Sequence, residues 1–162
     1  MKVWTTGGGT RVSRLLGGRC NCFLVSDGRA SLLVDSGLAR SWKVLSRRLD
    51  ERTADEGALA LLVLTHAHFD HAGNAARLRE RGVPVAIRRE EAGNLRRGDG
   101  TLPRGTNWLT RRIIEPLGRR LQSRLRYAPA ESQLVVEGER HDLRPLGFDA
   151  YLLHVPGHSP GS

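Results

Sequence analysis

The chain has 162 residues, which is enough to bury one hydrophobic core and too few for two domains of ordinary size. Its composition, with 39% hydrophobic and 27% charged residues, is that of a soluble globular protein and excludes intrinsic disorder as the default state. The net charge of +9 favours anionic partners such as acidic small molecules, nucleic acid or lipid head groups, although the arginine bias behind it is equally expected from a GC-rich genome.

The N-terminal segment is predicted to form a β-meander. Glycine-rich turns separate its short apolar stretches, and Asp27-Gly28 is a dipeptide that tolerates the positive φ of a tight hairpin turn. The strand after this turn ends at Asp35-Ser36-Gly37, where small residues allow a sharp bend. The predicted strands are Lys2–Trp4, Arg11–Leu16, Cys20–Ser26 and Ala30–Asp35.

The two cysteines, Cys20 and Cys22, lie two residues apart in a predicted strand, where they are poorly placed to bridge each other. We therefore expect reduced, buried thiols, as in cytosolic proteins. The first seven residues lack the apolar core of a signal peptide, and the longest apolar run, Ala58–Leu64, is shorter than the roughly 20 residues that span a bilayer. A cytoplasmic protein without a membrane span is the expectation.

A helix is predicted over Arg40–Glu51. Its apolar residues Trp42, Leu45 and Leu49 recur every three or four positions, which is the period of an amphipathic helix, and Trp42 is expected to pack in the core. The next stretch, Leu59–Leu64, is apolar at every position, as in a strand covered on both faces. Such a strand would deliver the residues that follow it to the rim of a sheet.

Half of the six histidines follow this strand directly, in the stretch Thr65–Asn74, here called the histidine loop. His66 and His68 are two residues apart, so in an extended backbone they point to the same side, whereas on a helix they would be about 200° apart. Asp70 and His71 follow, so four ligand-capable side chains can converge from one loop. Imidazole nitrogen and carboxylate oxygen are ligands of Zn²⁺ and related divalent metals. The loop therefore predicts a metal site, with surface histidines on a polar loop as the alternative.

Helices and strands are predicted to alternate after the histidine loop, which implies parallel strands joined by right-handed crossovers. Further strands are expected near the end of the chain. The predicted elements are helices over Ala75–Arg81 and Arg89–Leu95, and strands over Val83–Ile87, Gln133–Glu137, His141–Leu143 and Asp149–Val155.

An arginine-rich segment, Trp108–Tyr127, lies between these elements, and its apolar residues recur at helical spacing. Pro116 and Gly118 should break or kink a helix there. The segment is either a basic patch for phosphate or nucleic acid, or an amphipathic helix pair with a solvated arginine face. Its arginines are Arg111, Arg112, Arg119, Arg120, Arg124 and Arg126.

His158 follows the last predicted strand, on a turn that Pro156-Gly157 introduces. Together with His66 and His68 it would supply three nitrogen ligands and leave one coordination position open. An open position is typical of catalytic zinc sites, because it holds a water whose pKa the metal lowers to about 7. The three histidines therefore predict a source of hydroxide at neutral pH.

The sequence also carries several motifs in the order found in one large enzyme family. The histidine loop reads His-x-His-x-Asp-His at a strand end, and it is accompanied by Asn21–Val25, Val34–Gly37 and His154–Ser162. On these motifs the chain resembles the metallo-β-lactamase-fold hydrolase superfamily. The resemblance implies an α/β fold in one domain, residues 1–162: an αββα sandwich in which two mixed β-sheets pack together with helices outside.

The resemblance further implies roles for individual residues. Asp70 and His71 would hold a second metal that shares the attacking water with the first, and Asp70 would also orient or deprotonate this water. Asp35 would support a ligand histidine from outside the ligand set, although it also reads as an ordinary turn residue. The implied cofactor is Zn²⁺, with two ions in the complete protein and iron or manganese as alternatives.

The chain departs from the family where it ends, at Ser162. The aspartate that bridges the two metals and the last histidine of the second site are not found, and neither are the remaining elements of the second half of the fold. We therefore expect a C-terminally truncated member with one well-ligated metal and with Asp149–Val155 left as an exposed edge.

The leading functional hypothesis is a hydrolase whose metal-bound hydroxide attacks a small-molecule ester, thioester or lactone, as in hydroxyacylglutathione hydrolase. One alternative is a phosphodiesterase or ribonuclease of the same fold, which the positive charge motivates; nucleic acid is the less favoured partner. A non-catalytic metal-binding fragment is another alternative, and a single-iron oxygenase that acts on persulfides is a minor one.

Overall fold

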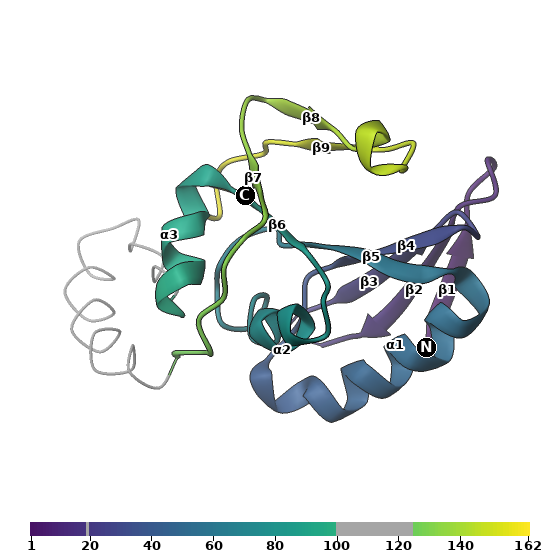
Figure 1. Cartoon of the computed structure of the whole chain (residues 1–162), viewed down its shortest axis with the longest axis horizontal. Coiled ribbons are helices and arrows are strands. Elements are labelled where there is room, and N and C mark those ends of the chain that lie inside the picture. The colour runs from purple at the N-terminus through teal and green to yellow at the C-terminus, as the bar shows by residue number, and fades with distance from the viewer. Residues whose placement is uncertain (19, 100–124) are drawn as a thin grey trace.

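The computed structural model describes residues 1–18, 20–99 and 125–162. Within these residues, seven strands form one mixed sheet whose spatial order follows the chain (Figure 1). The strands are β1 (Lys2–Thr5), β2 (Arg11–Leu16), β3 (Cys22–Ser26), β4 (Ala30–Val34), β5 (Ala58–Val63), β6 (Val85–Arg88) and β7 (Leu134–Val136).

The sheet changes from antiparallel to parallel pairing at β4. Strands β1 to β4 form an antiparallel meander, and β4 to β7 pair in parallel. In the turn before β4, Asp27 Oδ1 accepts hydrogen bonds from the backbone N–H groups of Arg29 and Ala30, and Gly28 has a φ of 87°. The predicted meander and the predicted parallel pairing are both confirmed.

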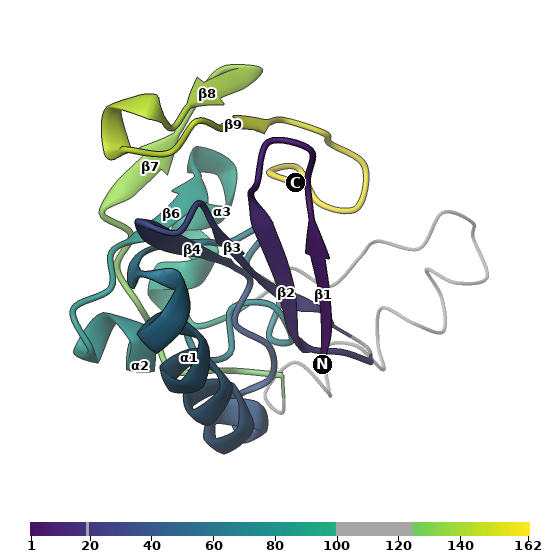
Figure 2. The ribbon, with the colours of Figure 1, turned by 90° about the vertical axis from the view of Figure 1, so that its right-hand side faces the viewer.

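Helices connect the parallel strands, and α1 (Trp42–Glu56) and α2 (Ala75–Glu80) lie together on one face of the sheet (Figure 2). The predicted end of α1 at Glu51 is wrong, because the helix continues to Glu56. Glu56 is 1% exposed and forms ion pairs with Arg52 on the same helix and with Arg11 on β2, a long-range contact that periodicity does not reveal. The helices are η1 (Ala39–Ser41), α1 (Trp42–Glu56), α2 (Ala75–Glu80) and α3 (Arg89–Arg97).

Two hydrophobic clusters lie on the two faces of the sheet, since neighbouring residues of a strand point to opposite faces. Leu62 of β5 packs with Leu45 and Leu49 of α1 on the helical face, whereas Leu61 and Val63 pack on the opposite face. The second half of β5 is therefore buried on both sides, as predicted, whereas Ala58 and Ala60 in its first half are exposed. Packing on both sides fixes the point at which the histidine loop leaves the sheet.

A second, two-stranded sheet covers the opposite face (Figure 1). It consists of β8 (Arg140–Asp142) and β9 (Tyr151–Leu153), which η2 (Arg144–Leu146) helps to connect. Leu143 and Phe148 anchor this hairpin against the larger sheet. Two packed sheets with helices outside the larger one confirm the predicted fold class, and the described residues contain no helix outside the smaller sheet.

The last strand, β9, is shorter than the predicted strand Asp149–Val155. The backbone N–H of His154 still donates across the hairpin to the carbonyl of Glu139, whereas that of Val155 donates to the carbonyl of Ser162 at 2.8 Å. Tyr151, Leu153 and Val155 are 49%, 58% and 68% exposed. Among the described residues β9 pairs with β8 alone, so its other edge is unpaired, as expected.

Other expected boundaries shift by one or two residues. Strand β3 begins at Cys22 instead of Cys20, beside a register shift in its pairing with β2, and both cysteines are free and buried, as predicted. Most of the arginine-rich segment Trp108–Tyr127 lies outside the described residues. In the described part of the chain, no helix has the length and apolar character needed to cross a membrane.

Candidate metal centre

The candidate site forms where two neighbouring parallel strands end. Asp35 follows β4 and Thr65 follows β5 closely, and the carboxyl ends of parallel strands meet at one edge of a sheet. Asp35 Oδ1 accepts a hydrogen bond from the backbone N–H of Thr65 at 2.9 Å, and the Thr65 hydroxyl lies 2.9 Å from Oδ2. Asp35 has a φ of 59°, in the left-handed region, and is 4% exposed. The bend after β4 thus turns this carboxylate toward the start of the histidine loop.

Three histidines converge beside this carboxylate: His66 and His68 from the histidine loop and His158 from the terminal turn, residues 156–162. One ring nitrogen from each lies within 4.8 Å of the others. His68 Nδ1 and His158 Nε2 are 3.2 Å apart, and the ring centres of His66 and His158 are 4.7 Å apart. The structure therefore brings together the three nitrogen ligands that the sequence proposed, here called the three-histidine site.

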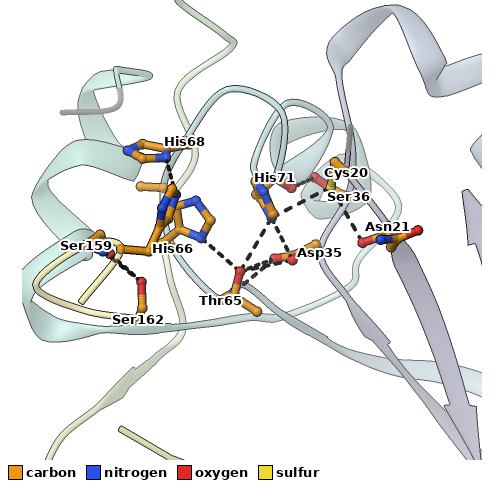
Figure 3. A network of polar contacts seen from close by, with 12 residues as sticks. Cys20, Asn21, Asp35, Ser36, Thr65, His66, His68, His71, Ser159 and Ser162 are labelled. Carbon is orange, nitrogen blue, oxygen red and sulfur yellow. Dashed lines mark hydrogen bonds and ion pairs between the residues drawn. The ribbon is translucent and has the colours of Figure 1, made fainter. Parts of the chain in front are cut away.

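Hydrogen bonding determines which ring nitrogen of His66 has a lone pair available for a metal. The Thr65 hydroxyl has one hydrogen, which it donates to Asp35, so it accepts a hydrogen bond from His66 Nδ1 at 2.9 Å (Figure 3). This leaves a lone pair on His66 Nε2, which is buried and has no hydrogen-bond partner among the described residues. Burial, with smaller effects of the charges on His71, His68 and His158, lowers the pKa of His66 to about 3. His66 is thus neutral at pH 7, the form that binds metals.

The donor set fits a divalent transition metal. Zinc binds imidazole nitrogen at about 2.0–2.1 Å in tetrahedral geometry, which places two such nitrogens about 3.3 Å apart. The facing nitrogens of His68 and His158, in hydrogen-bonding contact at 3.2 Å, lie close to this spacing, and all three nitrogens lie within 4.8 Å of one another. A cation at this point would also satisfy the buried lone pair of His66, which otherwise costs free energy.

A second cluster contains Cys20, Asp35 and His71. His71 Nδ1 donates to Asp35 Oδ2 at 2.8 Å and lies 3.7 Å from Cys20 Sγ. Burial lowers the pKa of His71, but the hydrogen bonds to Asp35 and Cys20 outweigh it and raise this pKa to about 10. The contact of Cys20 with Cys22 is the main cause that lowers the Cys20 pKa to about 6, against the effect of burial. Asp35 already accepts hydrogen bonds from Thr65 and His71. These residues therefore hold the loop in place and do not form a set of free ligands.

Asp70 lies on the same loop and is half-buried, but it belongs to neither cluster of the described residues. The loop tightens around it, because the backbone N–H groups of His71 and Ala72 both donate to the carbonyl of His68. The assignments of Asp70 and His71 to a second metal and of Asp35 to a supporting role remain predictions.

Sequence reasoning missed several residues that hold the loop in place. Ser36 Oγ donates to the carbonyl of His71 at 2.8 Å and accepts from the backbone N–H of Asn74 at 3.1 Å. Asn74 Nδ2 donates in turn to the carbonyls of Ser36 and Leu38. Thr65 and Cys20 were missed as well. For Ser36 and Thr65 the one signal in the sequence was their position just after predicted strands.

Comparison with known proteins gives consistent results. A family model described as "Metallo-beta-lactamase superfamily" matches residues 15–162. Acyl-coenzyme A thioesterase MBLAC2 from Gallus gallus is 35% identical over 154 residues, which cover 90% of this chain and 52% of that protein. Probable metallo-hydrolase YqgX from Bacillus subtilis is 29% identical, over 86% of this chain and 56% of its own length. The chain thus spans about half the length of the curated relatives it matches.

Solved structures share the fold. The subclass B3 metallo-beta-lactamase BJP-1 of Bradyrhizobium japonicum superposes with a TM-score of 0.66 at 19% identity, over 94% of this chain and 51% of the enzyme. The metallo-beta-lactamase GOB-18 from Elizabethkingia meningoseptica gives a TM-score of 0.67 at 18% identity, over 100% of this chain and 54% of that one. At these identities the likeness concerns the fold alone.

Proposed function

The chain belongs to the metallo-beta-lactamase superfamily, and we propose on this basis that it is a zinc-dependent hydrolase of small acyl thioesters. The family is one of divalent-metal hydrolases. The observation that carries the proposal is the three-histidine site with its unpartnered, buried His66 Nε2. The names of the thioesterase and metallo-hydrolase relatives support the choice of a thioester substrate.

The three histidines and the residues of the loop around them have separate proposed roles. His66, His68 and His158 would hold the metal, which when bound supplies a Lewis acid for the carbonyl oxygen and a water of lowered pKa. Thr65 and Asp35 keep His66 in the tautomer that offers Nε2. Asp70, half-buried on the same loop, is proposed to accept the proton of the attacking water. The water oxygen then bonds to the acyl carbon, the carbon–sulfur bond breaks, and the thiolate takes up a proton on leaving.

Turnover of an acyl-coenzyme A thioester, followed by the thiol that it releases, tests this proposal. The zinc-loaded chain is compared with His68→Ala, Asp70→Asn and the matched control Glu90→Gln on the exposed side of α3. We expect the rate to fall by about 100-fold or more in the first two variants and to be unchanged in the control. The Asp70→Asn variant should retain its metal at the three-histidine site. A His68→Ala variant as active as the wild type would contradict the proposal.

A second candidate, a phosphodiesterase or ribonuclease, is favoured by the net charge of +9. The same protein preparations, assayed with an activated phosphodiester and with RNA, distinguish the two functions. Turnover of the diester without turnover of the thioester, together with RNA binding that weakens steeply with salt, would favour the second candidate.

A further inference from the structure

A buried carboxylate on α3 lies against the peptide between two of the metal-site histidines. Glu91 is 1% exposed, and its Oε2 accepts a hydrogen bond from the backbone N–H of Ala67 at 3.2 Å. Ala67 separates His66 from His68, so the contact fixes the backbone from which both side chains project. Glu90, an exposed neighbour on α3, pairs with Arg88 instead and makes no hydrogen bond to the histidine loop among the described residues.

The other side of Ala67 is held as well. The Tyr127 hydroxyl, which is also buried, donates to the carbonyl of Ala67 at 2.8 Å. Tyr127 is positioned by the end of α3, because its backbone N–H donates to the carbonyl of Gly98 at 3.0 Å. Both polar groups of Ala67 are therefore tied to α3 and the residue docked on its end.

Glu91 also contacts the terminal turn. A Cβ built on Gly161 would lie 2.5 Å from Glu91 Cγ and 3.4 Å from its Oε1, so the turn approaches this side chain as closely as a glycine allows. Figure 1 shows the C-terminus beside α3. This turn carries His158, the third nitrogen ligand. The second oxygen, Oε1, is buried and has no hydrogen-bond partner among the described residues.

We infer that Glu91 is a positioning residue that sets the spacing of the three-histidine site, by accepting the Ala67 N–H on one side and seating the Gly161 backbone on the other. The His68–His158 nitrogen separation of 3.2 Å joins two segments far apart in sequence, and Glu91 contacts both. The inference rests on the metal site of the proposed function but not on its substrate.

The test measures zinc affinity by competition with a chromophoric chelator, and the visible absorption of Co²⁺ as a report of ligand geometry. Glu91→Leu removes the acceptor, and Glu91→Gln keeps an oxygen that can accept the Ala67 N–H. Supporting residues of metal ligands typically change affinity by about 10–100-fold. We expect Glu91→Leu to bind zinc at least about tenfold more weakly than the wild type and to show an altered Co²⁺ spectrum. Glu91→Gln and the control Glu90→Leu should bind zinc nearly as tightly as the wild type.

Gly161→Ala provides a test that keeps Glu91 and the interior of α3 intact. Its φ is not in the left-handed region, and the tight contact of the added methyl is with Glu91 Cγ, because Arg88 Cβ, at 3.4 Å, is at an ordinary van der Waals distance. We expect about tenfold weaker zinc binding in a chain whose circular dichroism is unchanged. If Glu91→Leu fails to fold, the zinc affinity of Gly161→Ala tests the positioning role of Glu91.

Two results overturn the inference alone: wild-type affinity in both Glu91→Leu and Gly161→Ala, or a Glu91→Gln variant as weak as Glu91→Leu. A wild-type chain that takes up neither zinc nor cobalt overturns the proposed metal site itself, and the inference with it. The two failures are therefore distinguishable.

Discussion

At the scale of single residues, the site depends on a short chain of hydrogen bonds that runs from His66 through Thr65 and Asp35 to His71 (Figure 3). The donor and the acceptor of each hydrogen bond follow from the chemistry, since the carboxylate can only accept and the hydroxyl has one hydrogen to donate. The network selects the tautomer of His66 and holds His71 at the same time. Histidines that bind metals commonly depend on such partners for orientation.

Replacing Thr65 tests this network directly. Thr65→Val keeps the shape of the side chain but removes the hydroxyl that accepts the His66 Nδ1–H. We expect zinc affinity to fall by about tenfold, and Thr65→Ser to bind nearly as tightly as the wild type. Chelator competition measures both, and equal affinities for the valine and serine variants would refute this role of the hydroxyl.

Asp35 should matter for stability as well as for metal binding. Asp35→Ala leaves the Thr65 N–H and the His71 ring without their buried acceptor and places alanine at a φ of 59°. The expected loss is about 3 kcal/mol in the free energy of unfolding, measured by urea titration in the presence of a chelator. Asp35→Asn should lose less, because asparagine tolerates this φ and keeps one acceptor oxygen. A loss below about 0.5 kcal/mol for the alanine variant would count against the account.

At the scale of elements, the histidine loop is packed against the segment that leads from β4 into α1. Gly73 is the closest point, since a Cβ there would lie 2.5 Å from the carbonyl oxygen of Gly37 and 2.6 Å from the backbone nitrogen of Ala39. Ser36 and Asn74 add hydrogen bonds across the same contact. The loop is thus shaped by backbone packing as much as by its own sequence.

Gly73→Ala should therefore destabilise the protein by about 2 kcal/mol or more, because backbone atoms must move to admit the methyl group. Gly93→Ala within α3 is the matched control: its Cβ would meet only the end of the Arg97 side chain, and alanine favours helix by about 0.5–1 kcal/mol. Urea unfolding compares the two. Equal stabilities would show that the close approach at Gly73 is not required.

The sequence was sufficient for features that depend on local patterns. Alternation and turn residues predicted the meander, and the apolar run before Thr65 correctly indicated a strand that ends at the histidine loop. What it could not supply depends on contacts between distant segments. The length of α1 follows from the burial of Glu56 beside Arg11, and the role of Thr65 follows from the alignment of β4 with β5.

At the scale of the whole molecule, the three-histidine site connects two parts of the fold. His66 and His68 leave the large sheet after β5, whereas His158 follows the hairpin of β8 and β9 on the opposite face. Leu143 and Phe148 of this hairpin are buried against the larger sheet. A metal at the site would therefore add a link between the loop after β5 and the turn after β9.

Zinc should accordingly stabilise the folded chain. At a free zinc concentration about 1,000 times the dissociation constant, the gain is about 4 kcal/mol, because the metal binds the folded state alone. We expect a higher urea midpoint with zinc than with a chelator for the wild type, and no increase for His158→Ala. The same increase in both proteins would place the stabilising metal elsewhere.

The central claim is that His66, His68 and His158 together form one metal site, and metal analysis after equilibrium dialysis against micromolar zinc tests it most directly. The account predicts one tightly held zinc ion per wild-type chain, the same in the control His141→Ala on β8, and a loss of this ion in His158→Ala. A wild-type chain that retains no zinc, or a His158→Ala chain that retains as much as the wild type, would contradict it.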